Sequence, residues 1–461
     1  MSQPAEQFII IDDLSKGMNT YDPDGRVPKG FYVDSQNMLL TNKVPITIAG
    51  ITKLNISAAP ASSKILWFEP YTDSAGVSSF IAACDDGWLR KYVLSTDTWT
   101  TLLQITSTAI DYVHTPFRGN LFLSNGIDPI MKYDGTNVLP VGALLVADWE
   151  SDETWTNGAA DTINVYEGTQ SRGSLTNGVI TYIDYATAKD FLTGLNGGTS
   201  FASTDKFEFY LKRTAGSGTT ALTVRFGNVA DTVYFEATAT ATDTTAWQKI
   251  SILRSAFALT GVPVWSSIAR FKVSHATAGN TISIDHAYHI YNLAPPVGDF
   301  IELYAQQLVV SGIDSDPVRI VYSDAGTPDE FPTANIARFS GGRHVFEKTD
   351  QITALRAYFD ELIVGKVNSA WTFSGTGSNV SISALPLTIG VDGHRAIAET
   401  PWSLHFLFEN NIFGARLTSR GLVSTNISSL LTDLDGTNLQ KNVTIRHDRT
   451  HTIRWGLRKN T

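Results

Sequence analysis

Residues 361–375 read ELIVGKVNSAWTFSG, and this stretch decides the fold. A short apolar run ends at Gly365, and apolar and polar residues then alternate up to a turn at Gly375. The alternation continues downstream, where 404–408 (LHFLF) and 412–417 (IFGARL) flank an asparagine-rich turn. Strands and turns at intervals of roughly ten residues are typical of consecutive hairpins, and no window here keeps the helical period. We therefore predict meandering antiparallel sheet.

Related patterns recur along the chain. Three apolar residues followed by a small residue occur at 121–124 (LFLS), 308–311 (LVVS) and 362–365 (LIVG). Near the start of the chain, four strand-like runs follow one another, the number that one propeller blade needs, at 65–68, 79–83, 88–92 and 98–102. Divergent repeats with a period of roughly 35 to 50 residues are typical of propellers. We predict an all-β chain whose main part is a β-propeller of about five to six blades.

The repeat is interrupted in a segment rich in Thr, Ala and Gly. Within it, 207–212 (FEFYLK) and 269–274 (ARFKVS) alternate, which places Phe207 and Phe209 on the same face of a strand. Alternating strands over this length suffice for a β-sandwich with its own core. The predicted organisation is a leader that closes the propeller, the first blades, an inserted jelly-roll sandwich and the remaining blades, at 1–63, 64–146, 147–293 and 294–461.

The last strand-like runs, 443–447 (VTIRH) and 452–457 (TIRWGL), make only half a blade. An open edge strand invites pairing with another chain. We therefore expect either the leader or a second chain to complete this blade.

The composition bounds the class of protein. With 461 residues, 43% of them hydrophobic and 17% charged, the chain is globular and long enough for more than one domain. Its formal net charge of -10 argues against nucleic-acid binding, although an acidic lining would suit a channel through which DNA slides. The single cysteine, Cys84, excludes an intramolecular disulfide and a cysteine-rich zinc site, and is expected to be buried. Since no secretory signal and no run of about 18 apolar residues is present, we expect a soluble protein made in a cytoplasm.

Motifs for catalysis and metal binding have simpler structural interpretations. His447 and His451 have the spacing of a metal pair on a helix, but they flank a predicted hairpin turn and no Glu follows His447. The aspartates of DPDG at 22–25 and of DLDG at 433–436 lack the Glu that completes an EF-hand loop. Nucleophile-elbow, P-loop and dinucleotide motifs are absent in usable context. We therefore predict that the chain is not an enzyme.

A resemblance to a known family sets the main functional expectation. The segment that decides the fold resembles a blade-to-blade passage in the propeller domain of phage tail nozzle or head-completion proteins. The residues that carry the resemblance are SAWTFSG at 369–375, Ile389-Gly390, AIAET at 396–400, the hairpin at 404–414 and ISSLL at 427–431. The leader is similar too, although AGITK at 49–53 stands where that family often has arginine-proline-glycine.

The interrupting segment resembles the jelly rolls of carbohydrate-binding modules. The matching features are Glu150 near the first strand, WQKI at 247–250 followed by SAF at 255–257, and SIDHAY at 283–288 as the last strand. In such modules the acidic residue of the first strand and the aspartate of the last can bind a structural calcium, an ion that prefers oxygen ligands. The resemblance thus implies a calcium site at Glu150 and Asp285, with exposed strand carboxylates as the alternative.

The same resemblance raises sugar binding through exposed aromatic residues of the segment. Trp155 and Trp265 are the candidates, with core tryptophans as the alternative interpretation of both. Calcium is the only cofactor that the sequence suggests.

The phage resemblance implies a structural protein of the virion tail, assembled in the bacterial cytoplasm. It implies a homo-oligomeric ring, often a hexamer, around the DNA channel, which docks on an adaptor or connector and carries tail fibres. Sequence-specific nucleic-acid binding and membrane insertion are not expected.

Two other functions stay open. The first is a carbohydrate-binding or carbohydrate-degrading propeller protein, with the jelly roll as the module for a host surface glycan. A glycosidase would need two facing carboxylates, which no linear motif declares. The second, a secreted kelch-like adhesin, is disfavoured by the missing signal peptide.

Overall fold

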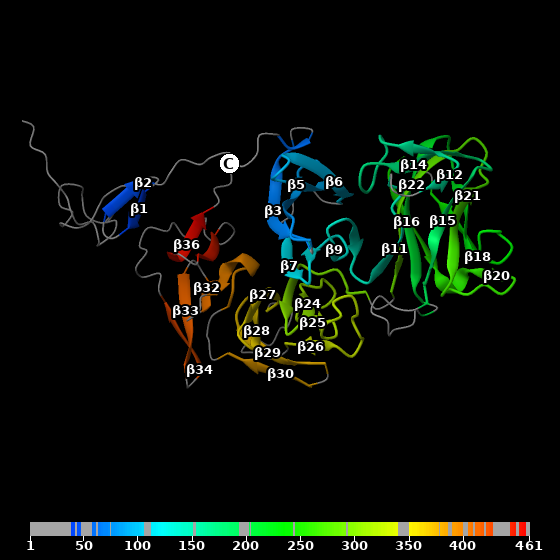
Figure 1. The fold of residues 1–461 in the computed structure, drawn as a ribbon. Helices are drawn as coiled ribbons and strands as arrows, with labels where there is room; N and C mark the ends of the chain where they lie inside the picture. The colour runs from blue at the N-terminus through cyan, green and yellow to red at the C-terminus, as the bar shows by residue number, and fades with distance from the viewer. Residues whose placement is uncertain are drawn as a thin grey trace, which may run out of the picture.

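The computed structural model consists of strands joined by turns and loops (Figure 1). It describes residues 58–399 with gaps at 61–62, 74, 106–111, 151–153, 193–201, 203, 243–244, 292–293, 340–349, 378 and 386–389, and also 38–41, 44–47, 404–408, 411–418, 421–426, 443–448 and 451–457. In this part of the chain the helical elements are two short 3-10 turns, η3 (Arg254–Ala256) and η5 (His394–Ala396). The prediction of an all-β chain is confirmed. No helix among the described residues is long and apolar enough to cross a membrane.

Five four-stranded antiparallel sheets make up one part of the molecule, and in each the strands lie in chain order. The first sheet has β3 (Ile65–Thr72), β4 (Ser78–Cys84), β5 (Trp88–Val93) and β6 (Thr98–Gln104). The second has β7 (Val113–Phe117), β8 (Asn120–Ser124), β9 (Met131–Tyr133) and β10 (Val138–Pro140). The third has β23 (Phe300–Tyr304), β24 (Gln307–Ser311), β25 (Arg319–Tyr322) and β26 (Ile336–Arg338).

The fourth and fifth sheets contain the stretch from which the sequence prediction began. The fourth has β27 (Ile352–Tyr358), β28 (Glu361–Lys366), β29 (Ala370–Thr376) and β30 (Asn379–Ala384). The fifth has β31 (Ile397–Glu399), β32 (Leu404–Phe408), β33 (Asn411–Thr418) and β34 (Gly421–Asn426). The pairing of β28 with β29 and of β32 with β33 confirms the predicted antiparallel hairpins.

Neighbouring sheets pack face to face through buried hydrophobic clusters. Trp67 and Leu121 belong to the cluster between the first and second sheets, whereas Phe122 and Val310 belong to the one between the second and third. Val309 belongs to a further cluster with the fourth sheet. Because successive residues of a strand point to opposite faces, the second and third sheets are each packed on both sides.

The first strands of successive sheets also contact one another in series. Strand β7 contacts β23, β23 contacts β27, and β27 contacts β31. The hairpin of β35 (Val443–Asp448) and β36 (His451–Leu457) continues the series, since β35 contacts β31. Figure 1 shows the sheets following one another along an arc. Most of the predicted leader lies outside the described residues, apart from 58–60, residue 63 and the pair β1 (Met38–Thr41) and β2 (Val44–Thr47).

A two-layered β-sandwich lies between the second and third sheets in sequence. One layer holds β13 (Ala159–Asp161), β14 (Ser171–Thr176), β22 (Thr281–Ile290), β16 (Lys206–Ala215) and β19 (Gln248–Leu253), with β11 (Ala143–Ala147) also paired to β22. The other holds β12 (Trp155–Thr156), β15 (Ile180–Lys189), β21 (Ile268–His275), β17 (Thr220–Gly227), β18 (Tyr234–Ala241) and β20 (Ala258–Thr260).

The two layers share one aromatic core, which includes Phe207, Phe209, Phe226 and Phe271. The prediction that Phe207 and Phe209 lie on the same face is confirmed, because both are buried in this core. The first and last strands of the sandwich are neighbours, since Ala143 of β11 pairs with Ile290 of β22.

Candidate functional site

One layer of the sandwich carries polar and aromatic side chains on the face opposite the core. In β16, Glu208 and Tyr210 alternate with the core residues and therefore point to this face. Tyr288 of β22 and Ser251 of β19 are the cross-strand partners of Glu208. We call this surface the polar face, defined by Tyr166, Glu208, Tyr210, Trp247, Lys249, Ser251 and Tyr288.

Glu208 fixes the polar groups of this face. Its carboxylate accepts hydrogen bonds from the Ser251 hydroxyl at 2.9 Å and the Tyr288 hydroxyl at 3.0 Å. The Lys249 ammonium lies 3.2 Å from the same carboxylate. Glu208 is buried, whereas the Lys249 side chain is 42% exposed and can reach a ligand in solvent.

Three partly exposed aromatic residues lie beside these polar groups. Tyr166 stacks on Tyr210 with ring centroids 3.6 Å apart, and Trp247 meets Tyr166 edge to face at 5.8 Å. Burial raises the pKa of Tyr166 and of Tyr210, so both hydroxyls keep their protons at neutral pH. Tyr210 also packs against the cluster that contains Leu139 of β10, and Tyr166 packs against the cluster between the first and second sheets. The part of the rings that stays open lies next to fixed hydrogen-bonding groups.

A buried acidic group lies next to the aromatic residues. One oxygen of Asp285 accepts hydrogen bonds from the backbone N–H of Tyr166 at 2.8 Å and of Glu167 at 3.1 Å, and the other accepts from His286 at 2.8 Å. Glu167 in turn contacts Nδ1 of the His286 ring. Burial raises the pKa of Asp285 well above its usual value, and it also raises the pKa of Glu167.

The structure brings the two predicted calcium ligands to opposite ends of one segment. Glu150 accepts hydrogen bonds from the backbone N–H of Thr169 at 2.8 Å and of Gln170 at 3.3 Å, while Asp285 holds residues 166 and 167. Both carboxylates are thus used to hold the backbone of segment 166–170. In the described part of the chain, no group of three or more His, Cys, Asp or Glu residues could hold a metal ion. Calcium binding stays a prediction.

The same segment joins the sandwich to the first sheet. The backbone N–H of Gly168 donates to the carbonyl oxygen of Leu102 at 2.8 Å, and the N–H of Gln104 donates to that of Tyr166, also at 2.8 Å. Residues 166–168 therefore add to the edge of β6 as a short extra strand, a pairing that leaves fewer backbone groups open.

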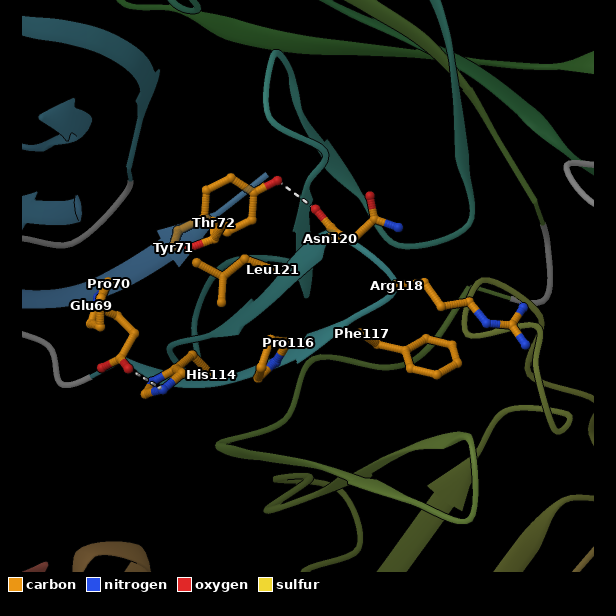
Figure 2. A pocket seen from close by; sticks show the side chains of 11 residues that line it. Glu69, Pro70, Tyr71, Thr72, His114, Pro116, Phe117, Arg118, Asn120 and Leu121 are labelled. Atoms are coloured by element: carbon orange, nitrogen blue, oxygen red, sulfur yellow. Dashed lines mark hydrogen bonds and ion pairs between the residues drawn. The ribbon is translucent and has the colours of Figure 1, made fainter. Parts of the chain in front are cut away.

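A second candidate site lies between the first strands of the first and second sheets. This pocket has a volume of about 340 Å³. Residues of β3, β7 and the start of β8, and of the turn between β7 and β8, line it (Figure 2). At one end the carboxylate of Glu69 lies 3.2 Å from Nε2 of His114. At the other end the Arg118 guanidinium lies over the Phe117 ring and donates to the carbonyl oxygen of Gly326 at 3.1 Å.

One wall of this pocket is fixed by a hydrogen bond. The Tyr71 hydroxyl donates to the carbonyl oxygen of Gly119 at 2.5 Å, and burial raises the pKa of Tyr71 to about 12. This hydroxyl is therefore a fixed, protonated wall group. Two charged ends and an aromatic wall fit a small polar ligand.

The two tryptophans predicted as sugar-binding candidates are not exposed. Trp265 belongs to the sandwich core. Trp155 packs against that core and stacks on Trp149 with ring centroids 5.0 Å apart. The alternative of a core tryptophan is confirmed for Trp265, whereas Trp155 is partly buried at the edge of that core.

The remaining sequence predictions have simpler outcomes. His451 pairs with Asp448 in the hairpin of β35 and β36, which confirms the hairpin interpretation of the His447 and His451 spacing. Cys84 is buried, as expected. The DPDG and DLDG turns lie outside the described residues.

Sequence reasoning missed Tyr166 and Glu167. They lie in a Gly- and Thr-rich loop whose sequence has no period, and their partners are more than 100 positions away in β22. The alternation of 207–212 was a usable signal for Glu208 and Tyr210, since it put both on the face opposite the core.

Comparisons with known proteins found similar folds only for part of the chain. No family model matches, and no curated protein matches. A family 11 carbohydrate-binding module from Clostridium thermocellum, solved with a beta-1,3-1,4-mixed-linked tetrasaccharide, is 12% identical and covers 33% of this chain and 98% of its own, with a TM-score of 0.24. A family 30 module from a cellulosomal cellulase of the same organism is 15% identical over 33% of this chain and 94% of its own, with a TM-score of 0.23. An agarase is 10% identical over 34% of this chain and 25% of its own, with a TM-score of 0.24. At these values the likenesses say nothing of what this chain binds.

Proposed function

We propose that this chain is a structural, ring-forming subunit of a phage tail or neck, built on a β-propeller. The observation that carries the proposal is the serial contact of first strands from β7 through β23, β27 and β31 to β35. In a propeller the first strands of the blades surround a central axis, and consecutive blades pack face to face. The sequence resemblance to nozzle and head-completion proteins supplies the phage assignment.

Long-range ties between the sheets suit a load-bearing part. The Lys132 ammonium lies 2.8 Å from the Asp329 carboxylate, which joins the second sheet to the segment after β25. The buried Lys366 ammonium lies 3.1 Å from Asp350 and donates to the carbonyl oxygen of Phe339 at 2.8 Å. Such charged groups are costly to separate. The Lys132 and Asp329 pair thus ties the second sheet to the third, and the Lys366 hydrogen bond to Phe339 ties the fourth sheet to the end of the third.

Under this proposal the ring surrounds the DNA channel, docks on a head-proximal adaptor and carries fibres or host-binding proteins. The net charge of -10 fits a lining along which DNA slides, because few cations are available to bind phosphate.

The mass of the purified chain by light scattering, followed by negative-stain imaging, tests the proposal. We expect closed rings of several subunits with a central hole, alone or after addition of a head–tail connector. A chain that stays monomeric with and without a connector would overturn the ring-forming function.

A second candidate function is carbohydrate binding by the sandwich, and the polar face favours it. Trp247 and Tyr166 expose part of their rings beside Glu208 and Lys249, and sugars are bound through apolar ring contact combined with hydroxyl hydrogen bonds. A glycan array with the full chain and with Trp247→Ala tests it. Binding that the variant loses supports the candidate. Equal binding by both proteins, or none by either, contradicts it, and release of reducing ends would add a degrading activity.

A further inference from the structure

The first sheet has two unlike faces. Trp67 and Tyr71 of β3 belong to the cluster shared with the second sheet, and both are buried. Phe68 is next to Trp67 and therefore points to the opposite face, where 57% of it is exposed. Pro70 lies on the same side and is also exposed, and the Phe80 ring of β4 lies 6.1 Å from the Phe68 ring.

The sheets inside the series do not leave such a face open. In the second sheet Leu121 and Phe122 are neighbours that enter two different clusters, one on each side. In the third sheet Leu308 and Val309 do the same. All four side chains are almost completely buried. In the first sheet Arg90 and Tyr92 of β5 are buried on the same side as Phe68. The open part of this face is therefore the apolar strip of Phe68 and Pro70 along β3. This exposed strip is the exception that needs a covering element.

The other end of the series is also incomplete. Strand β35 contacts the first strand of the fifth sheet, the position that a first strand of a sixth sheet would take. Among the described residues the sheet that β35 begins holds β35 and β36, whereas the five sheets before it in the series have four strands each. Figure 1 shows the first sheet and this hairpin at the two ends of the arc.

We propose that the hairpin of β35 and β36 from the same chain packs on the Phe68 face and closes the ring of sheets. This inference rests on the propeller arrangement of the proposed function. The hairpin follows the fifth sheet as each sheet follows the one before it, so the next surface in the ring is the face of the first sheet that is open. Closure within one chain also removes an apolar patch that would otherwise draw two copies together.

Cysteine cross-linking of the full chain tests the proposal. In a Cys84→Ala background, Phe68→Cys is combined with Thr444→Cys or with Ile445→Cys, and a short bismaleimide is added. Adjacent strand residues point to opposite faces, so one of the two pairs should cross-link efficiently within a single chain and the other weakly. Val262→Cys, on the sandwich and 87% exposed, replaces Phe68→Cys in the matched control.

The outcomes separate closure from the proposed function. An intramolecular cross-link in one pair, located by peptide mass spectrometry and absent from the control, supports closure even if imaging finds no rings of subunits. Cross-links only between two chains would overturn it in favour of a second copy. Free cysteines that react fully with a small maleimide but never cross-link would overturn it as well. Deletion of residues 443–461 is a second, independent test. The rate at which maleimide labels Phe68→Cys should rise several-fold in the shortened chain.

Discussion

Asp285 and Glu150 hold the two ends of one backbone segment, residues 166–170, through hydrogen bonds from its N–H groups. Between these ends, Gly168 donates to Leu102 of the first sheet. The two carboxylates therefore act on the junction between the sandwich and the sheets, although neither lies in the first sheet.

Replacing Asp285 should weaken this junction. Asp285→Asn places an amide NH2 among three backbone donors in a fully buried site, so we expect a loss of about 1–3 kcal/mol in the free energy of unfolding. Glu150→Gln, at a partly exposed position, should cost less than about 1 kcal/mol. Urea unfolding followed by tryptophan fluorescence measures both. Equal losses in the two variants would show that burial of Asp285 does not set the cost.

The free energy of unfolding should depend on pH through the ionisation of Glu167. Burial raises its pKa, so the folded chain binds this proton more tightly than the unfolded chain. The contribution of Glu167 to the free energy of unfolding is then fully present below the unfolded-state pKa of about 4.3. It is lost as the pH rises through the higher pKa of the folded state. Glu167→Gln removes this loss. The melting temperature of the variant minus that of the wild type should therefore increase as the pH rises.

Melting curves at a series of pH values for the wild type and Glu167→Gln check this expectation. Glu361→Gln, a partly exposed position at the start of β28, serves as the control. If the melting temperature of Glu167→Gln falls relative to that of the wild type as the pH rises, Glu167 is not the group responsible. Asp148, Asp285 and His286 lie close to Glu167 and are left unchanged in both proteins.

The Lys366 and Asp350 pair should stabilise the fourth sheet, because Lys366 ends β28 and Asp350 lies just before β27. Lys366→Met leaves the Asp350 carboxylate buried without its cation, and we expect a loss of about 3–5 kcal/mol. The double variant Lys366→Met/Asp350→Asn should recover much of it, because both buried charges are then absent. Denaturant unfolding of Lys366→Met, Asp350→Asn and the double variant gives the coupling. A double variant as unstable as the sum of the single ones contradicts the pairing.

Replacing Asp329 should destabilise the protein more than replacing its partner Lys132. Its carboxylate lies 2.8 Å from the ammonium and also accepts a hydrogen bond from the N–H of Gly142 at 3.2 Å. Asp329→Ala therefore removes two interactions and Lys132→Ala one. A double-mutant cycle should give a coupling of at least about 0.5 kcal/mol with Asp329→Ala the costlier change. Additive effects, or the reverse order, would count against this tie.

The sequence predicted those features that depend on neighbouring residues. Alternation at 369–375 and the turn after 404–408 act over a few positions, and both hairpins were placed correctly. Asp285 was singled out only through the resemblance of 283–288 to the last strand of carbohydrate-binding modules, as a calcium ligand. The structure keeps it buried, where it accepts backbone hydrogen bonds.

The junction could not be predicted from local pattern. Pairing of residues 166–168 with β6 joins parts of the chain more than 60 positions apart through backbone groups, which every residue has. The backbone hydrogen bond from Gly168 to Leu102 therefore cannot be predicted from the identities of the side chains. Only part of the polar face could be predicted from the sequence. Alternation places Glu208 on it, whereas Tyr166 lies in a loop that has no periodic pattern.

The sandwich leaves the sheets and returns to them at one place. Ala143 pairs with Ile290, and the N–H of Tyr291 donates to the carbonyl oxygen of Gly142 at 3.0 Å. The span between Gly142 and Tyr291 is therefore that of a tight turn, whatever is carried between them. Shortening, enlarging or exchanging the sandwich would therefore leave the distance from the second sheet to the third unchanged. Changes in the sandwich can thus accumulate at this site while the sheets on either side keep their arrangement.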